Sequence, residues 1–355
     1  MSFRKLTGKA LTSILAAGSL LFLAGCSQQA SPPAADPPPA VNPTQTPAET
    51  STPTEEPTAQ PAGDLNWPLT GIPTNQIANR PALLLKVEGS AMARPQAGLE
   101  YADVVYEVVV EGGITRFVAI YDSLIPDMVL PIRSARGTDI AIVEPYYGVF
   151  GYSGSNASVL ERIRESGIQS LTFDAGAAGF RRVAGRAAPH NVAADPDVLL
   201  GQANASRQVP VQGSQRFAAD FAGSSIASGQ PVSQISARMS NIQTTNWAWD
   251  EASGEFLRSD GAAPSMTAAG TQMSATNVIL LSVPMTTVEG LPEGILIGTG
   301  NAAFASGGRY IQGTWQKTAD NQPFRFQDLA GNEVVFAPGT TWLQLVPTSS
   351  SWSIN

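Results

Sequence analysis

The sequence is poor in the two side chains that most often carry catalysis and metal binding. It has one cysteine, Cys26, and one histidine, His190. A disulfide within the chain, a zinc site made of cysteines and a site with two histidine ligands are therefore excluded. A catalytic triad could use only His190 as its base. Any metal would be held mainly by oxygen ligands, which favours magnesium, calcium or manganese.

Basic side chains are also scarce. The formal net charge is −8, and removal of the three cations of the amino-terminal leader (Arg4, Lys5 and Lys9) makes it −11. A protein that binds nucleic acid needs a basic surface to neutralise phosphates. The composition therefore predicts no nucleic-acid partner.

The sequence lacks a hydrophobic run long enough to span a bilayer, which takes about 20 apolar residues. Its longest candidate, residues 10–23, follows three cations and ends in the sequence Leu-Ala-Gly-Cys. This pattern is typical of a signal peptide, residues 1–25, that ends in a lipobox. We therefore expect Cys26 to carry lipid, such as palmitate, and to anchor the protein to the cell membrane on its extracytoplasmic side.

Composition divides the rest of the chain into three segments. Residues 26–63 begin with Cys26 and are dominated by Pro, Thr, Ala and Ser, which predicts a disordered tether. Residues 64–222 mix strand and helix patterns and predict a mixed α/β (α+β) domain with a candidate ligand site. Residues 223–355 show short alternating segments between turn residues, which predicts a smaller, mostly β domain of sandwich or barrel type.

The most regular strand pattern lies on either side of Gly112 and Gly113. If these glycines form a two-residue hairpin loop, Val109 lies opposite Arg116 and Glu107 opposite Val118. One face of the hairpin would then be apolar, and Arg116 would lie between Glu107 and Glu111 on the other. These charges either line a site or form solvent-exposed ion pairs of small energy.

The polar loop that follows the next apolar segment contains Arg133 and Arg136 beside Ser, Gly and Thr. Guanidinium groups suit an anionic ligand because their paired N–H donors match phosphate or carboxylate oxygens. His190 and Asn191 lie in a later loop and are expected nearby. The alternative is that the arginines tie this loop to neighbouring carboxylates.

Several segments resemble the YerB-like lipoproteins of bacteria, a family with two domains of unknown function. They are NRPALLLKVEG, ARPQAGLEYADVVYEVVVEGGITRFVAIY, PIRSAR, RRVAGRAAPHNV, GTWQK and FQDLAGNEVVFAPGTTWLQLVP, and the resemblance extends from about residue 67 to 347. It implies an extracytoplasmic lipoprotein with two domains and no stated reaction. Family members often have a His-Gly-Gly segment where this chain has Tyr152-Ser153-Gly154-Ser155, so a chemistry that needs a second histidine is disfavoured.

A weaker likeness in the order of elements is to the LytR-CpsA-Psr enzymes, which transfer lipid-linked glycans to peptidoglycan. Three hypotheses follow. The protein binds an anionic cell-wall ligand or partner, or it is an enzyme acting on cell-wall glycan or glycan phosphate, or it is an interaction module for an envelope enzyme. The residues that each hypothesis would use can be grouped by role. Ligand binding would use Arg116, Arg133, Arg136 and Asn191; catalysis His190 or Glu107; and a divalent cation such as magnesium Asp103, Glu107 or Asp139.

Overall fold

The computed structural model describes residues 63–207 and 215–355. These residues belong to one compact unit, Ala59–Asn355. The expected signal peptide, the lipid site Cys26 and the tether up to residue 62 lie outside the described residues.

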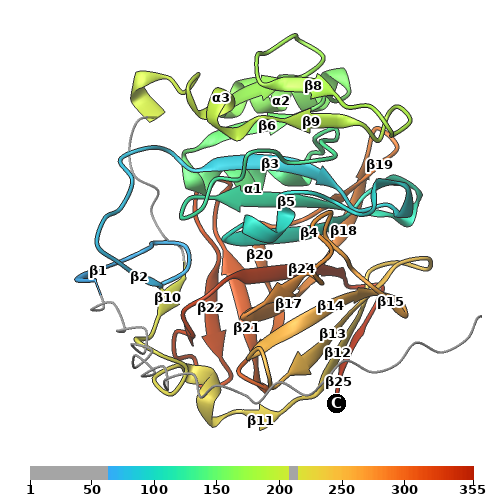
Figure 1. The fold of residues 1–355 in the computed structure, drawn as a ribbon. Coiled ribbons are helices and arrows are strands. Elements are labelled where there is room, and N and C mark those ends of the chain that lie inside the picture. Colours follow the sequence, from blue (N-terminus) through green and yellow to red (C-terminus); the bar gives the residue numbers. More distant parts are fainter. Residues whose placement is uncertain (1–62, 208–214) are drawn as a thin grey trace, which may run out of the picture. The chain divides into compact units, whose positions relative to one another are not determined.

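An 11-stranded sheet forms the centre of the fold (Figure 1). Its strands, in spatial order, are β11 (Gln230–Pro231), β21 (Arg309–Lys317), β20 (Gly298–Ser306), β17 (Asn277–Val283), β24 (Thr341–Pro347), β4 (Val104–Val109), β5 (Thr115–Tyr121), β3 (Leu83–Glu88), β6 (Val149–Tyr152) and β7 (Gln169–Thr172), and β22 (Arg325–Asp328) pairs with β21. Strands from both halves of the sequence meet where β24 runs parallel to β4, with Gln344 beside Glu107. Backbone hydrogen bonds therefore join the two halves.

A second sheet of six strands packs on the first. It contains β15 (Ala263–Pro264), β14 (Glu255–Asp260), β13 (Thr244–Asp250), β12 (Gln234–Arg238) and β25 (Trp352–Ile354), and β16 (Ser274–Ala275) pairs with β14. The remaining strands form the pairs β1 (Leu65–Asn66) with β2 (Pro73–Thr74), β8 (Phe180–Arg182) with β9 (Val192–Ala194), β10 (Arg216–Phe217) with β23 (Val335–Phe336), and β18 (Met285–Val288) with β19 (Leu291–Gly294). The α-helices of the described residues are α1 (Thr138–Val143), α2 (Ala157–Ser166) and α3 (Pro196–Leu200).

Two hydrophobic cores cover opposite faces of the large sheet. One contains side chains of α1 and α2 packed on Val104, Val118 and Ile120. The other contains side chains of the six-stranded sheet and α3 packed on neighbouring residues of the same strands, such as Val105 and Ala119. Because both faces are covered, β3, β4 and β5 are buried along their whole length, which explains their nearly continuous apolar runs.

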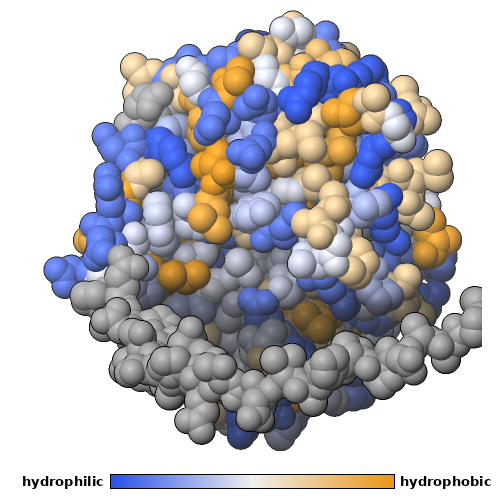
Figure 2. All heavy atoms as spheres, in the orientation of Figure 1, coloured by the Kyte–Doolittle hydropathy of each residue, from blue (hydrophilic) through white to orange (hydrophobic). Residues whose placement is uncertain are grey.

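The surface is less regular than the core. On the face shown in Figure 2, hydrophobic and hydrophilic residues are interspersed over the described part of the chain. Exposed large hydrophobic residues come from separate segments, for example Met92, Leu124 and Leu329. Single exposed apolar residues of this kind are normal for folded proteins.

The β4–β5 hairpin is present, but the register predicted from the sequence is wrong by one residue. Glu107 pairs with Phe117, and Val108 pairs with Arg116. The loop has three residues, because the Val110 N–H donates to the Ile114 carbonyl and Glu111 joins the two glycines in the turn. A slip of one residue exchanges the faces, so Glu107 and Arg116 lie on opposite faces of the sheet.

The expected fold class is confirmed in part. Residues 223–355 are all described, and they contain strands and one short 3-10 helix, η6 (Ser225–Ser228), so the mostly β character is confirmed. The segment before them holds three α-helices but is richer in strands than expected from its sequence, and its strands share the large sheet with the C-terminal half. The boundary at residues 222 and 223 stays a prediction.

Gln344 gives a first testable prediction, because its side chain is fully buried and neither amide atom has a hydrogen-bond partner among the described residues. A buried polar group without a partner costs about 1–3 kcal/mol. We expect Gln344→Leu to raise the free energy of unfolding by about 1–2 kcal/mol in urea denaturation. The exposed strand residue Gln316 is the matched control, and Gln316→Leu should change stability by less than about 0.5 kcal/mol. A loss of stability in Gln344→Leu would contradict the unpaired amide.

Candidate functional site

A buried carboxylate, Glu88, lies at the carboxyl end of β3 and is 1% exposed. Its two oxygens both lie 2.9 Å from Nδ1 of His190, and the Ser90 hydroxyl donates to Oε1 at 2.7 Å. Arg133 Nε lies 3.3 Å from Oε2. A carboxylate can only accept, so the Nδ1–H tautomer donates to Glu88 and leaves Nε2 as the free ring nitrogen. Glu88 therefore orients the only imidazole of the chain.

The backbone after Glu88 is held by side chains of the next turn. Gln96 Nε2 donates to the Glu88 carbonyl at 2.9 Å, and Arg94 Nη2 donates to the Gly89 carbonyl at 3.0 Å. Position 89 must be glycine, because a Cβ there would lie 2.6 Å from the Thr115 carbonyl oxygen. The apolar run of β3 thus ends in a turn whose conformation is fixed on both sides.

His190 lies in the loop that joins β8 to β9. Arg186 of this loop donates from Nη1 to the Ala93 carbonyl at 2.7 Å and ties the loop to the turn after β3. Asn191 is 8% exposed and accepts from Arg182 Nη1 at 2.6 Å. Asn191, expected to bind ligand, therefore lies near the site, but its side-chain oxygen is bound to Arg182 of the adjoining strand.

Arg133 differs from the other two arginines that the sequence singled out. Its side chain is 18% exposed, and its terminal Nη atoms have no hydrogen-bond partner in the described part of the chain. The backbone of Arg133 is rigid, because its N–H donates to the Lys86 carbonyl and its carbonyl accepts from Ser153. With Nε against Glu88, the guanidinium offers its two Nη groups as donors beside this carboxylate.

Arg116 and Arg136 both bind Glu111. Arg116 Nη2 lies 2.8 Å from Oε1, and Arg136 Nε lies 2.7 Å from Oε2. Burial alone would raise the pKa of Glu111, but the hydrogen bond from Arg136 and the charge of Arg116 outweigh burial and lower that pKa to about 2. Arg116 also donates to the Ser134 carbonyl at 2.7 Å. These two arginines tie the loop to the hairpin, which is the alternative that the sequence left open.

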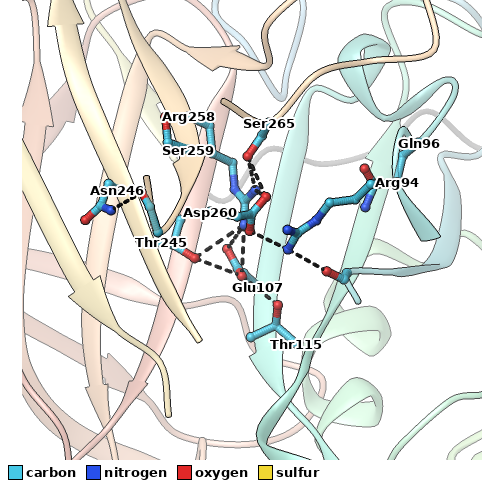
Figure 3. A network of polar contacts seen from close by, with 12 residues as sticks. Arg94, Gln96, Glu107, Thr115, Thr245, Asn246, Arg258, Ser259, Asp260 and Ser265 are labelled. Carbon is cyan, nitrogen blue, oxygen red and sulfur yellow. Dashed lines mark hydrogen bonds and ion pairs between the residues drawn. The ribbon is translucent and has the colours of Figure 1, made fainter. Parts of the chain in front are cut away.

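Glu107 belongs to a separate network on the other face of the sheet (Figure 3). It is fully buried and accepts from Thr115 Oγ1 at 2.7 Å, from Thr245 Oγ1 at 3.0 Å and from Arg258 Nη2 at 3.0 and 3.1 Å. Arg258 also binds Asp260 at 2.9 Å. Glu107 is thus enclosed by partners and does not lie with His190.

This network nevertheless reaches the site through Arg94. Figure 3 shows Arg94 and Thr115 approaching from the N-terminal half and Thr245 and Arg258 from the C-terminal half. Arg94 Nη2 lies 2.8 Å from Asp260 and also binds the Gly89 carbonyl, the residue after Glu88. Groups from both halves of the chain therefore position the turn that carries Glu88.

The three residues expected to bind a metal lie apart and have other partners. Asp139 Oδ1 lies 2.6 Å from Lys86 Nζ in a fully buried ion pair. Asp103 accepts from the backbone N–H of Asp122 and from Ser123, and Glu107 is bound as described above. Within residues 63–207 and 215–355, no group of three or more His, Cys, Asp or Glu side chains is arranged to hold a metal ion. The divalent cation stays a prediction.

Sequence reasoning missed Glu88 and Lys86. Both are charged residues inside the apolar run LLLKVE, and both are buried, at 1% and 0% exposed. A charge within a strand that is apolar on both faces is the signal that could have found them, because a buried charge requires a partner. Their partners, His190 and Asp139, lie far away in the sequence.

Comparisons with known proteins agree with this architecture. The N-terminal domain described as "Protein of unknown function (DUF3048)" matches residues 69–209, and the C-terminal domain of the same description matches residues 235–343. "Putative lipoprotein YerB" of Bacillus subtilis (strain 168) is 26% identical over 303 residues, which cover 83% of this chain and 90% of that protein. The resemblance expected from the sequence is confirmed.

A solved structure is also similar. The crystal structure of the YerB protein from Bacillus subtilis matches with a TM-score of 0.71 at 23% identity, covering 81% of this chain and 99% of that one. At this identity the match supports the fold alone. Within the described residues, none of the helices has the length and apolar character needed to cross a membrane.

Proposed function

The chain belongs to the DUF3048 family, and on this premise we propose that it is a membrane-anchored lipoprotein of the cell envelope that binds an anionic group at Arg133. The ligand is a phosphate- or carboxylate-bearing cell-wall polymer, or a partner protein that carries such a group. The lipobox ending at Cys26 and the similarity to a lipoprotein support the anchor. The free Nη atoms of Arg133 are the observation that carries the binding.

The charge around Arg133 favours an anion. Four cationic side chains and three carboxylates interact electrostatically at this end of β3. They are Lys86, Arg116, Arg133 and Arg136 against Glu88, Glu111 and Asp139. One positive charge is left over in a protein that is acidic as a whole, because Arg116 and Arg136 share Glu111. Arg133 contacts Glu88 through Nε and keeps its Nη donors for a ligand. A guanidinium of this kind binds phosphate or carboxylate through two parallel hydrogen bonds.

Binding to isolated cell-wall fragments tests this proposal. The mature chain with Cys26→Ser, which has no site for lipid, should bind the fragments, and Arg133→Ala should weaken binding about tenfold or more because a charge-assisted hydrogen bond contributes about 1.5–3 kcal/mol. Arg238→Ala removes the same charge from β12 in the second sheet and should bind like the parent.

Fragments stripped of phosphate-linked glycan separate the two anion classes. Lost binding identifies a phosphate ligand, and retained binding identifies a carboxylate. Equal binding by the Arg133→Ala and Arg238→Ala variants would exclude Arg133 as the ligand site.

A further inference from the structure

We propose that the site binds its anion together with a proton, which His190 takes up at Nε2. This inference rests on the proposed function, because it concerns the regulation of the same site. It makes binding strongest at acidic pH, so the anchored protein would hold its ligand according to the pH of the cell surface.

The geometry leaves one nitrogen of His190 available for this proton. Nδ1 faces both oxygens of Glu88 at 2.9 Å, whereas Nε2 has no hydrogen-bond partner among the described residues. The side chain is 20% exposed, so solvent can deliver a proton. The imidazole is the group whose ordinary pKa, about 6.5, permits a change of charge near neutral pH.

One buried carboxylate is shared by two potential cations. Glu88 contacts both Arg133 and His190, so with Arg133 always charged a protonated His190 would place two positive charges against one negative charge. An anion bound to Arg133 supplies the second negative charge. Binding of the anion therefore favours protonation of His190, and protonation favours the anion to the same extent, as linkage requires.

The other charged groups around His190 have fixed partners. Lys86, whose pKa burial lowers to about 8, is paired with Asp139 at 2.6 Å. Arg94 and Arg186 bind the carbonyls of Gly89 and Ala93. Arg116, directly opposite Glu88 across the β3–β5 pair, is bound to Glu111. A change in binding below pH 7 is therefore assigned to His190, because Lys86 loses its proton only near pH 8.

Sulfate is a suitable probe because it is a tetrahedral dianion that does not titrate between pH 5 and 8.5. His190 is the only histidine of the chain, so the ring nitrogens of a tag-free, nitrogen-15-labelled protein give a single set of NMR signals that need no assignment. We expect the midpoint of the His190 titration to rise when sulfate replaces chloride at equal ionic strength. Sulfate should bind several-fold more tightly at pH 5.5 than at pH 7, a range that lies below the titration of Lys86.

Two variants separate the inference from the proposed function. His190→Gln keeps a neutral polar side chain and should bind sulfate with the same affinity at both pH values. Arg133→Ala should abolish the effect of sulfate on the His190 midpoint. An unchanged midpoint in the parent protein overturns the proton coupling, whatever the result with cell-wall fragments. A sulfate effect that persists in Arg133→Ala overturns Arg133 as the anion site.

Discussion

Replacing Glu107 by leucine is expected to lower the free energy of unfolding by about 3–5 kcal/mol, because it leaves the buried charge of Arg258 without its main counterion. Arg258 is 2% exposed, and its guanidinium lies over the rings of both Phe117 and Trp342, at 5.2 and 5.3 Å from their centres. The hydroxyls of Thr115 and Thr245 would also lose their acceptor. Urea denaturation followed by tryptophan fluorescence measures this loss.

The double variant Glu107→Leu, Arg258→Met tests the cause. The double variant removes the charge that Glu107→Leu leaves behind, and Asp260 keeps Arg94 as its counterion at 2.8 Å. The double variant should therefore be more stable than Glu107→Leu alone. Glu161→Gln, which breaks the solvent-exposed pair with Arg164, is the control and should unfold close to the parent. If the double variant is less stable than Glu107→Leu, the lost counterion of Arg258 is not the source of the loss.

The strands of the central sheet could be predicted from the sequence, but their register could not. Apolar runs such as residues 104–110 and 117–121 identify buried strands by composition alone. The register depends on whether Glu111 belongs to the strand or to the loop, and the Gly112-Gly113 pair is compatible with both. Both glycines have positive φ, +69° and +74°, in the three-residue loop that the chain adopts. With Glu111 in the strand, as predicted, Arg116 and Glu107 share one face of the sheet. With Glu111 in the loop, as in the structure, they lie on opposite faces.

The candidate site depends on contacts that local patterns do not contain. Glu88 and His190 are 102 residues apart, and Glu107 and Arg258 are 151 residues apart. The sequence identified Arg133 and His190 as chemically unusual, and the structure places both beside Glu88. The sequence could not show that Arg136 and Arg116 form ion pairs with Glu111, because packing decides which carboxylate an arginine meets. The family resemblance covered all of these residues without indicating a role for any.

The stability of the protein is expected to rise between pH 8 and 10.5 because of Lys86. Burial lowers its pKa from 10.5 to about 8, although the charge of Asp139 opposes this shift. In that pH range the unfolded chain binds a proton that the folded protein does not, so the free energy of unfolding increases with pH. The gain from Lys86 reaches about 3 kcal/mol at pH 10.5, and below pH 8 the full cost of burying the charge remains.

Lys86→Met removes this titration, so the difference in unfolding free energy between the parent and the variant should grow in favour of the parent as the pH rises from 8 to 10.5. Tyrosine ionisation and other titrations common to both proteins cancel in that difference. Arg238→Met is the matched control, since a guanidinium keeps its proton throughout the range and its difference from the parent should stay constant. A constant difference for Lys86→Met as well would contradict the lowered pKa of Lys86. It would mean that Asp139, at 2.6 Å, keeps the Lys86 ammonium charged inside the fold and offsets the cost of its burial.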